Sequence, residues 1–388
     1  MSAVATRTMF TAAALAVTLA AGFAAPAAGS AGPAAGSAGP AAAGGHDAGL
    51  RSALDDLVAA GTPGAILLDR HHGRTVRLAA GYAEVTAPEP MRPADRFRAA
   101  SQMKSYTAVL VLQLVQEHRL GLDDPVDRLL PGVIPHGYGH GVTVRHLLQN
   151  NSGLFNFNND PRVLEPYLAG DLGHVWLPAQ LLEIAFEHEP SFPAGARFEY
   201  SDTNFILAAY VVEAVTGHSF DHELRSRILR PLGLRGTELP TTSAIGGRHA
   251  HGYTTIPGPT GDLDVTGLYP FSWAAGGLTS TVDDSAAFYR ALFGGRLLGP
   301  ALMLQLKTTI PVTDSDLPSR SGLGVQRWTP CGVAWGHSGD APGYLVYTWI
   351  SADTGDETVL MVNKDGPSLS PAAGAAYNAL LVRAFCGR

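Results

Sequence analysis

The spacing of apolar positions divides the chain into stretches with different periods. Within 46–60, apolar residues recur about one helical turn apart, which predicts a helix that packs by one face. Two apolar segments, 65–68 and 75–78, then flank His71-His72-Gly73, a pattern typical of a strand, a turn and a strand. An apolar run from 103 to 120 predicts a longer buried helix.

The middle of the chain has mostly helical periods, and the last third returns to strands. Segments 344–350 and 357–362 flank a hairpin signal at 352–356, and 372–385 predicts a closing helix. Strands near both ends predict one antiparallel sheet flanked by helices, an α/β (α+β) fold with a mostly helical insert at roughly 120–270. The site is then expected between the two lobes. The predicted helices of the insert include 144–148, 181–186, 204–216 and 220–229.

The first residues have the pattern of a targeting segment. Arg7 precedes an apolar stretch at 9–25, and small residues follow, so we predict a secretory signal peptide at 1–27. A membrane anchor is the alternative, but the run is short for a spanning helix and lacks a stop-transfer flank. A repetitive Ala/Gly/Ser/Pro tether is predicted at 28–46 and one hydrolase domain at 47–388. We therefore expect a secreted, extracellular protein without stable membrane insertion.

Composition narrows the possible partners and the compartment. The 388 residues are 46% hydrophobic, enough for a large buried core, and the net charge of −7 without a basic run argues against nucleic acid as a partner. There are two cysteines, Cys331 and Cys386. In an oxidising compartment an even count predicts one disulfide, and two free thiols are the alternative. His71 and His72 lack a third ligand in register, so no metal site is predicted there.

The candidate chemistry begins at Ser101-Gln102-Met103-Lys104, where the apolar helix of 103–120 starts. Residues three apart lie on the same side of a helix, so Lys104 would place its ammonium beside the Ser101 hydroxyl at the positive end of the helix dipole. A serine hydroxyl becomes a nucleophile when a neighbouring group takes its proton and its negative charge is stabilised. Taken by itself, the motif also fits a chance match at a helix start.

Two downstream segments argue against a chance match. They are Tyr200-Ser201-Asp202, just before a predicted helix, and His337-Ser338-Gly339-Asp340, just before a predicted strand. With Ser101-x-x-Lys104 they resemble, in order and spacing, the Ser-x-x-Lys, Tyr-x-Asn and His-x-Gly motifs of the penicillin-recognising serine enzymes. The resemblance covers nearly the whole mature chain. It points to the serine β-lactamase-like branch that holds D-alanyl-D-alanine carboxypeptidases, class C β-lactamases, D-aminopeptidases and related esterases, and it implies their β-lactamase/penicillin-binding-protein-like fold.

The resemblance implies roles for the three central side chains. Ser101 attacks a carbonyl and forms an acyl-enzyme. Tyr200, as phenolate or through Lys104, takes the Ser101 proton and later gives it to the leaving group. The Lys104 cation is expected to favour the phenolate and so to lower the pKa of Tyr200.

The His-x-Gly segment is expected to supply the oxyanion hole. The backbone N–H groups of Ser101 and Asp340 would bind the developing oxyanion, and Gly339 would let the substrate approach closely. His337 is expected to act by hydrogen bonding or electrostatics rather than as the base of a catalytic triad. The chain has no Gly-x-Ser-x-Gly elbow. Ser338 belongs to the same binding strand.

Three positions depart from the carboxypeptidase pattern. Asp202 replaces the amide of Tyr-x-Asn, and Asp340 stands where that type usually has Thr. Gln326 stands where that type has an Arg for the substrate carboxylate, and Arg327, one residue on, points to the other face of a strand. All three changes remove donors or positive charge, or add negative charge, on the leaving-group side.

The sequence thus predicts a secreted serine hydrolase that forms an acyl-enzyme and cleaves peptide, amide or ester bonds at D-amino acid residues, as a D-stereospecific aminopeptidase or amidohydrolase does. The alternatives are a D-alanyl-D-alanine carboxypeptidase acting on peptidoglycan stem peptides, a class C-like β-lactamase or esterase, and a non-catalytic penicillin-binding domain. Small D-amino-acid peptides, amides or esters are the expected partners, with β-lactams as possible inhibitors. No metal or organic cofactor is implied, and a monomer is expected.

Overall fold

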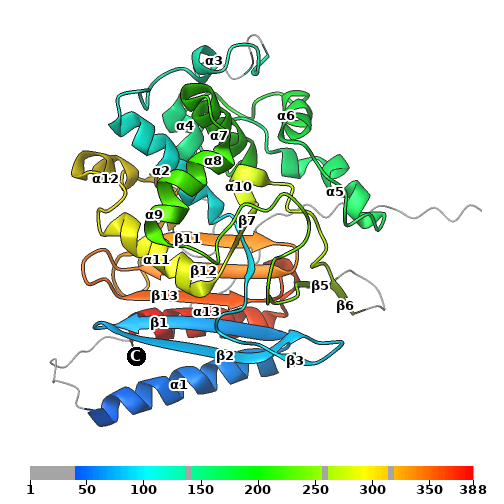
Figure 1. Ribbon diagram of the computed structural model, residues 1–388, viewed down its shortest axis with the longest axis vertical. Coiled ribbons are helices and arrows are strands. Elements are labelled where there is room, and N and C mark those ends of the chain that lie inside the picture. Colours follow the sequence, from blue (N-terminus) through cyan, green and yellow to red (C-terminus); the bar gives the residue numbers. More distant parts are fainter. Residues whose placement is uncertain (1–39, 136–137, 139–140, 256–260, 313–318, 388) are drawn as a thin grey trace, which may run out of the picture.

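A computed structural model describes residues 40–135, 138, 141–255, 261–312 and 319–387 of the chain. The predicted signal peptide and residues 28–39 of the predicted tether lie outside these ranges. Within these ranges, no helix is long and apolar enough to cross a membrane. Figure 1 shows a large sheet with helices on its faces and a mainly helical lobe beside it.

In the described part of the chain, one nine-stranded sheet has the order β3-β2-β1-β13-β12-β11-β10-β9-β8 (Figure 1). All its pairings are antiparallel, and the first strand lies beside the last, with Ala65 opposite Val362. The prediction of one antiparallel sheet built from both ends is therefore confirmed. The strands are β1 (Gly64–His71), β2 (Arg74–Glu84), β3 (Glu89–Pro90), β8 (Ile310–Pro311), β9 (Ser319–Ser321), β10 (Gln326–Trp328), β11 (Ala334–Ala341), β12 (Tyr344–Ile350) and β13 (Glu357–Val362).

Helices cover both faces of this sheet, which is why β13 is buried along its whole length. On one face lie the first and last helices, α1 (Pro40–Ala59) and α13 (Pro371–Cys386), whose leucines form a core with Trp349 of β12. On the other face lie α2 (Met103–Gln116) and α11 (Val282–Phe293), within the larger core that continues into the helical lobe. The site strand β11 thus has a helix layer on each side.

Helix α1 begins earlier than the sequence pattern suggested. It starts at Pro40 and so includes residues 40–46, which we predicted as the end of the tether. Alanine has the highest helix propensity, and proline is tolerated in the first helical turn, so this Pro-Ala-Ala-Ala stretch can extend a helix that is anchored further on by Leu50 and Leu54.

The helical lobe is built around α7 (Asp202–Thr216), whose residues 202–209 are all buried. The predicted helices at 181–186, 204–216 and 220–229 are confirmed within two or three residues, although 225–229 is a π-helical turn. The lobe also contains α3 (Val126–Leu129), α4 (Val144–Gln149), α5 (Pro161–Leu168), α6 (Pro178–Phe186), α8 (Phe220–Leu224) and α9 (Arg230–Leu232), with the 3₁₀ turn η1 (Phe157–Asn159).

Short elements connect the lobe to the sheet. Strand β4 (Phe97–Ala100) pairs with β7 (Leu278–Ser280) directly before α2. The other elements in the described ranges are the hairpin β5 (Tyr253–Thr255) and β6 (Asp262–Asp264), α10 (Trp273–Gly276), α12 (Pro300–Leu306) and η3 (Gly366–Ser368). Helix α2 ends at Gln116, four residues before the predicted end, where the polar residues 117–119 turn into solvent and His118 has a φ of 56°.

Cys331 and Cys386 form a disulfide across a sequence separation of 55, which confirms that prediction. It joins the loop before β11 to the last residue of α13. The closing helix is therefore attached to the sheet by a covalent bond as well as by apolar packing.

The double variant C331S/C386S should unfold more easily than the oxidised protein. In the chain-entropy model, removing a cross-link of this span lowers the free energy of unfolding by roughly 4 kcal/mol. Urea titrations of the double variant and of dithiothreitol-reduced wild type should agree with each other and lie below oxidised wild type. Equal stability of all three samples would show that packing alone holds α13.

Candidate active site

Ser101 lies in the turn between β4 and α2. The residue before it, Ala100, has a φ of 49°, a left-handed conformation that costs an L-residue roughly 1–2 kcal/mol. The turn is closed by the Lys104 N–H, which donates to the Ser101 carbonyl (3.0 Å). The buried side chain of Gln102 ties this turn to the sheet, because its Nε2 donates to Thr348 Oγ1 (2.9 Å) and to the His337 carbonyl (3.3 Å).

Three side chains that the sequence singled out meet at the Ser101 hydroxyl. Lys104 Nζ donates to Ser101 Oγ at 3.1 Å, and the Tyr200 hydroxyl donates to the same oxygen at 2.6 Å. Lys104 is fully buried, and its Nζ also donates to the Ala275 carbonyl on α10 at 2.7 Å. Segments that are distant in the sequence therefore converge on one hydroxyl.

Asp202 forms an ion pair with Lys104 rather than standing free beside the nucleophile. Its Oδ1 lies 2.5 Å from Lys104 Nζ, and its Oδ2 accepts a hydrogen bond from Asn158 Nδ2 (2.5 Å). Asp202 is the first residue of α7, so the central helix of the lobe carries the partner of the catalytic-site lysine. The extra negative charge that the sequence introduces here is offset by a buried positive charge.

This arrangement sets the protonation of Lys104 and Tyr200. Burial lowers the pKa of Lys104, and the Asp202 carboxylate opposes that shift. Burial raises the pKa of Tyr200 well above its usual value, and the negative charge of Asp202 adds to the rise. The expectation that Lys104 favours a Tyr200 phenolate is therefore wrong: Tyr200 is a neutral phenol, and Lys104 is the better candidate for the base.

His337 lies on the face of β11 that is turned toward α2. Its Nδ1 donates to the Ser338 carbonyl (2.5 Å), and burial, with the Lys104 charge adding to it, lowers the pKa of His337 to about 3. A neutral, buried imidazole of this kind positions its neighbours and does not carry the proton, in keeping with the sequence-based interpretation.

Gly339 brings β11 against the strand that leads into Ser101. A Cβ atom at this position would lie 2.1 Å from the Ala99 carbonyl oxygen, so any larger residue would push the two strands apart. The main chain around Gly339 is thereby held close to the turn that contains Ser101.

The side chains of Ser338 and Asp340 point to the other face of the sheet. Asp340 is opposite Leu345, which belongs to the core under α13, whereas Gly339 is opposite Val346 of the larger core. The exposed Asp340 carboxylate accepts a hydrogen bond from the Gly366 N–H at 3.1 Å. The part of Asp340 that lies nearest to Ser101 is therefore its main chain.

Gln326, which the resemblance matches to the carboxypeptidase arginine, lies beside Ser338. Its Oε1 accepts hydrogen bonds from the N–H and the hydroxyl of Ser338, both at 3.2 Å. Gln326 lies opposite Gly336 and Arg327 opposite Trp335. Side chains alternate along a strand, so Gln326 shares the face of Ser338 and Asp340, whereas Arg327 shares the face of His337. A neutral amide rather than a guanidinium adjoins Ser338.

Sequence reasoning missed three groups that complete the site: the Ala275 carbonyl, the Asn158 amide and the Gln102 amide. A backbone carbonyl leaves no side-chain signature, so Ala275 could not be found from its residue type. Asn158 and Gln102 are recognisable only through their partners, which lie far away in the sequence.

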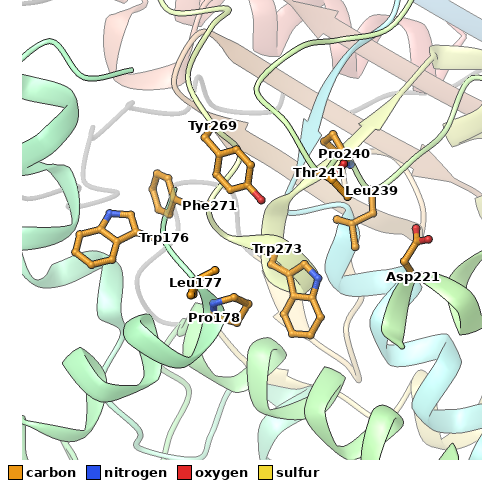
Figure 2. A pocket seen from close by; sticks show the side chains of 10 residues that line it. All are labelled: Trp176, Leu177, Pro178, Asp221, Leu239, Pro240, Thr241, Tyr269, Phe271 and Trp273. Atoms are coloured by element: carbon orange, nitrogen blue, oxygen red, sulfur yellow. The ribbon is translucent and has the colours of Figure 1, made fainter. Parts of the chain in front are cut away.

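An aromatic groove of about 190 Å³ opens near α10 (Figure 2). Ser101, Lys104 and Tyr200 are not among its lining residues. Its Trp273 precedes Ala275 by two residues and packs against Tyr210 and Phe220. The groove is lined by Trp176, Leu177, Pro178, Asp221, Leu239, Pro240, Thr241, Tyr269, Phe271 and Trp273.

A protein-family model described as Beta-lactamase matches residues 21–383. The chain belongs to the Beta-lactamase family. This family member is 25% identical over 300 residues to penicillin-binding protein 4* of Bacillus subtilis (strain 168), an alignment that covers 74% of this chain and 64% of that protein. It is 26% identical over 329 residues to the D-aminopeptidase of Brucella canis, covering 83% of this chain and 60% of that protein. The chain thus spans less than two thirds of the length of these curated relatives.

Two solved structures are matched over nearly their whole length. The D-stereospecific amidohydrolase from Streptomyces sp. is 33% identical with a TM-score of 0.79, over 88% of this chain and 99% of that one. The D-amino acid amidase from Ochrobactrum anthropi SV3 is 28% identical with a TM-score of 0.77, over 88% and 97%. The predicted serine β-lactamase-like family and fold are therefore confirmed.

Replacing Asp202 with Asn should move the pH dependence of this Beta-lactamase family member. The Asp202 carboxylate raises the pKa of Lys104, so its removal lowers that pKa and leaves the amine neutral at lower pH. We expect the acidic limb of kcat/KM against pH to shift to lower pH.

The matched control is Asp123→Asn, which breaks the surface pair with Arg145 (2.8 Å) and should leave the profile in place. An unmoved acidic limb in Asp202→Asn would contradict the assignment of Lys104 as the group that must lose its proton.

Proposed function

We propose that this chain is a secreted serine hydrolase that cleaves amide, peptide or ester bonds at D-amino acid residues through an acyl-enzyme on Ser101. The observation that carries the proposal is the position of the Ser101 hydroxyl between Lys104 Nζ and the Tyr200 hydroxyl. The similarity over nearly their full length to a D-stereospecific amidohydrolase and a D-amino acid amidase supports the choice of substrate. The signal-like segment at 1–27 supports secretion.

In the acylation step, Ser101 Oγ attacks the substrate carbonyl carbon and its proton passes to neutral Lys104. Because burial lowers the pKa of Lys104, the neutral amine is easier to reach than in water. The main-chain N–H groups of Ser101 and Asp340 are proposed to bind the oxyanion. The carbon–nitrogen or carbon–oxygen bond then breaks, and the leaving group takes a proton from the Tyr200 phenol, which Lys104 reprotonates.

Deacylation is the reverse transfer with water as the nucleophile. Water attacks the acyl-serine carbonyl and gives its proton to the same Lys104–Tyr200 pair, and Ser101 Oγ leaves with that proton. The products are a D-amino acid, or a peptide ending in one, and the regenerated hydroxyl. The Asp202 carboxylate stabilises the lysine cation that forms in each half of the cycle.

The charges around the site favour a substrate with a free amino group over one with a free carboxylate. Lys104 and Asp202 cancel as a pair, and Gln326 is neutral, so these positions offer a substrate carboxylate no net positive charge. Burial and the Asp202 carboxylate raise the pKa of Tyr200 most, and the Asp340 carboxylate adds a smaller rise from the other face of β11. The protein atoms packed around Asp340 raise its own pKa toward neutrality, but its solvent exposure limits that rise, so it is an anion above neutral pH.

Comparing kcat/KM across a substrate panel tests this proposal. D-alanine amide or a D-phenylalanine ester should be cleaved better than its L-enantiomer by a factor of about 100, and better than N-acylated D-Ala-D-Ala. The variant Ser101→Ala should reduce the rate by about 10⁴-fold or more on every cleaved substrate. Equal rates for the two enantiomers would reject D-specificity, and a preference for acylated D-Ala-D-Ala would favour the carboxypeptidase.

The variant Asp340→Asn tests whether the negative charge of Asp340 affects which substrates are preferred. It keeps the main chain of β11 but removes the anion, so kcat/KM should fall for substrates with a free amino group and stay unchanged for N-acylated ones. A uniform loss on both substrate types would show that Asp340 matters only for the geometry of the strand.

A further inference from the structure

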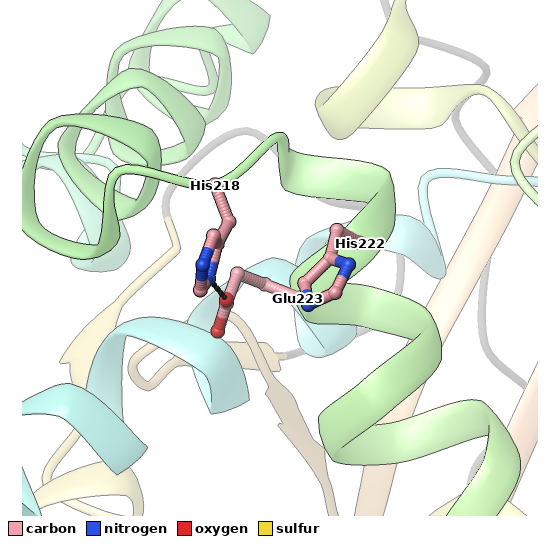
Figure 3. A group of neighbouring side chains, drawn as sticks. All are labelled: His218, His222 and Glu223. Carbon is pink, nitrogen blue, oxygen red and sulfur yellow. Dashed lines mark hydrogen bonds and ion pairs between the residues drawn. The ribbon is translucent and has the colours of Figure 1, made fainter.

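A second cluster of ligating side chains lies at the junction of α7 and α8, away from the serine site. Gly217 ends α7 in a left-handed conformation, with a φ of 77°, and the chain then turns back into α8. This turn brings together His218, His222 and Glu223 (Figure 3), whose ligand atoms all lie within 4.8 Å of one another.

The backbone of this turn is fixed by its own hydrogen bonds. Ser219 is the N-cap of α8, and its hydroxyl accepts from the His222 N–H (3.3 Å). The Glu223 N–H donates to the Ser219 carbonyl (3.1 Å), so both ligating residues of α8 lie in its first turn. His218, directly before the cap, faces them from the other arm of the turn.

The carboxylate of the cluster is buried and held in one orientation. Glu223 is only 3% exposed, its Oε2 accepts from Arg227 Nε, and its Oε1 lies 2.7 Å from His218 Nδ1. Arg227 also pairs with Glu117, so the charges of these three residues leave one net negative charge.

The two imidazoles, in contrast to the buried carboxylate, lie at the surface. His218 and His222 are both exposed, and their rings are 4.7 Å apart. They can therefore be reached from solution and can rotate toward a common point. Two imidazole nitrogens and one carboxylate oxygen are a donor set that suits Zn²⁺ and neighbouring divalent transition metals, with remaining positions open to water.

We propose that His218, His222 and Glu223 form a binding site for a divalent transition metal of the Zn²⁺ class. On binding, His218 exchanges its hydrogen bond with Glu223 for a bond to the metal, while Arg227 continues to hold the second carboxylate oxygen. The metal would join the end of α7 to the start of α8.

The expected consequence is stability rather than a change in chemistry. Asp202 begins α7 and the metal ligands follow its last residue, so the length of this 15-residue helix separates the two sites by about 22 Å. Phe220, in the same turn, packs against Trp273 of α10, so a fixed turn also supports that contact. A ligand that binds only the folded chain raises its melting temperature.

Zinc binding to tag-free, chelator-treated protein tests the proposal. Calorimetric titration with ZnCl₂ should give one site per chain, and Zn²⁺ should raise the melting temperature. Because both histidines are exposed, His218→Ala and His222→Ala should fold normally, as checked by circular dichroism. Each should weaken zinc binding by a factor of at least about 10–100, the loss typical even of residues that only support a metal ligand.

His249→Ala is the matched control, because His249 belongs to another pair of neighbouring histidines, with its ring 5.4 Å from that of His251. It should bind zinc as wild type does. Absence of zinc binding to wild type, or binding that survives both His218→Ala and His222→Ala, would overturn the proposal. Loss of binding in His249→Ala alone would place the metal elsewhere and overturn it equally.

Discussion

The buried ion pair between Lys104 and Asp202 is the interaction on which the rest of the site depends. A lysine ammonium that is fully removed from water costs several kcal/mol unless other groups replace its hydration. Here the replacements are the Asp202 carboxylate, the Ala275 carbonyl and the Ser101 hydroxyl, which come from α7, α10 and the turn before α2. Satisfying one cation therefore fixes how the helical lobe packs against the sheet, and it places the serine hydroxyl at the point where the segments meet.

The same pair decides which group can move the proton. A lone lysine cation beside Tyr200 would favour the phenolate, but the Asp202 carboxylate cancels that field and burial raises the pKa of Tyr200. The Tyr200 phenol therefore donates a hydrogen bond to Ser101. Burial lowers the pKa of Lys104, so the lysine becomes the group that accepts the Ser101 proton. The rigid frame around them is supplied by Gly339, which lets β11 approach the Ala99 carbonyl, and by the strained backbone of Ala100.

Features set by residues close together in the sequence were predicted correctly, whereas contacts between distant segments were not. The spacing of Ser101 and Lys104 predicted their contact because helix geometry fixes it, and the apolar period predicted the helix at 204–216. The partner of Asp202 depends on how two distant helices pack, which no local pattern contains. The direction of the Asp340 side chain follows from the register of β11 on β12, where a shift of one residue would reverse it. The start of α1 at Pro40 reflects alanine propensity, which the repetitive composition concealed.

Ser101, activated by Lys104 and Tyr200, is the residue that we expect to become acylated. Peptide mass spectrometry after reaction with a fluorophosphonate, or after rapid acid quench with a D-aminoacyl ester, measures this directly. We expect one adduct on the peptide that contains Ser101, no adduct in Ser101→Ala, and slower labelling in Tyr200→Phe and Lys104→Ala. An adduct on a different residue, or hydrolysis that persists in Ser101→Ala, would contradict it.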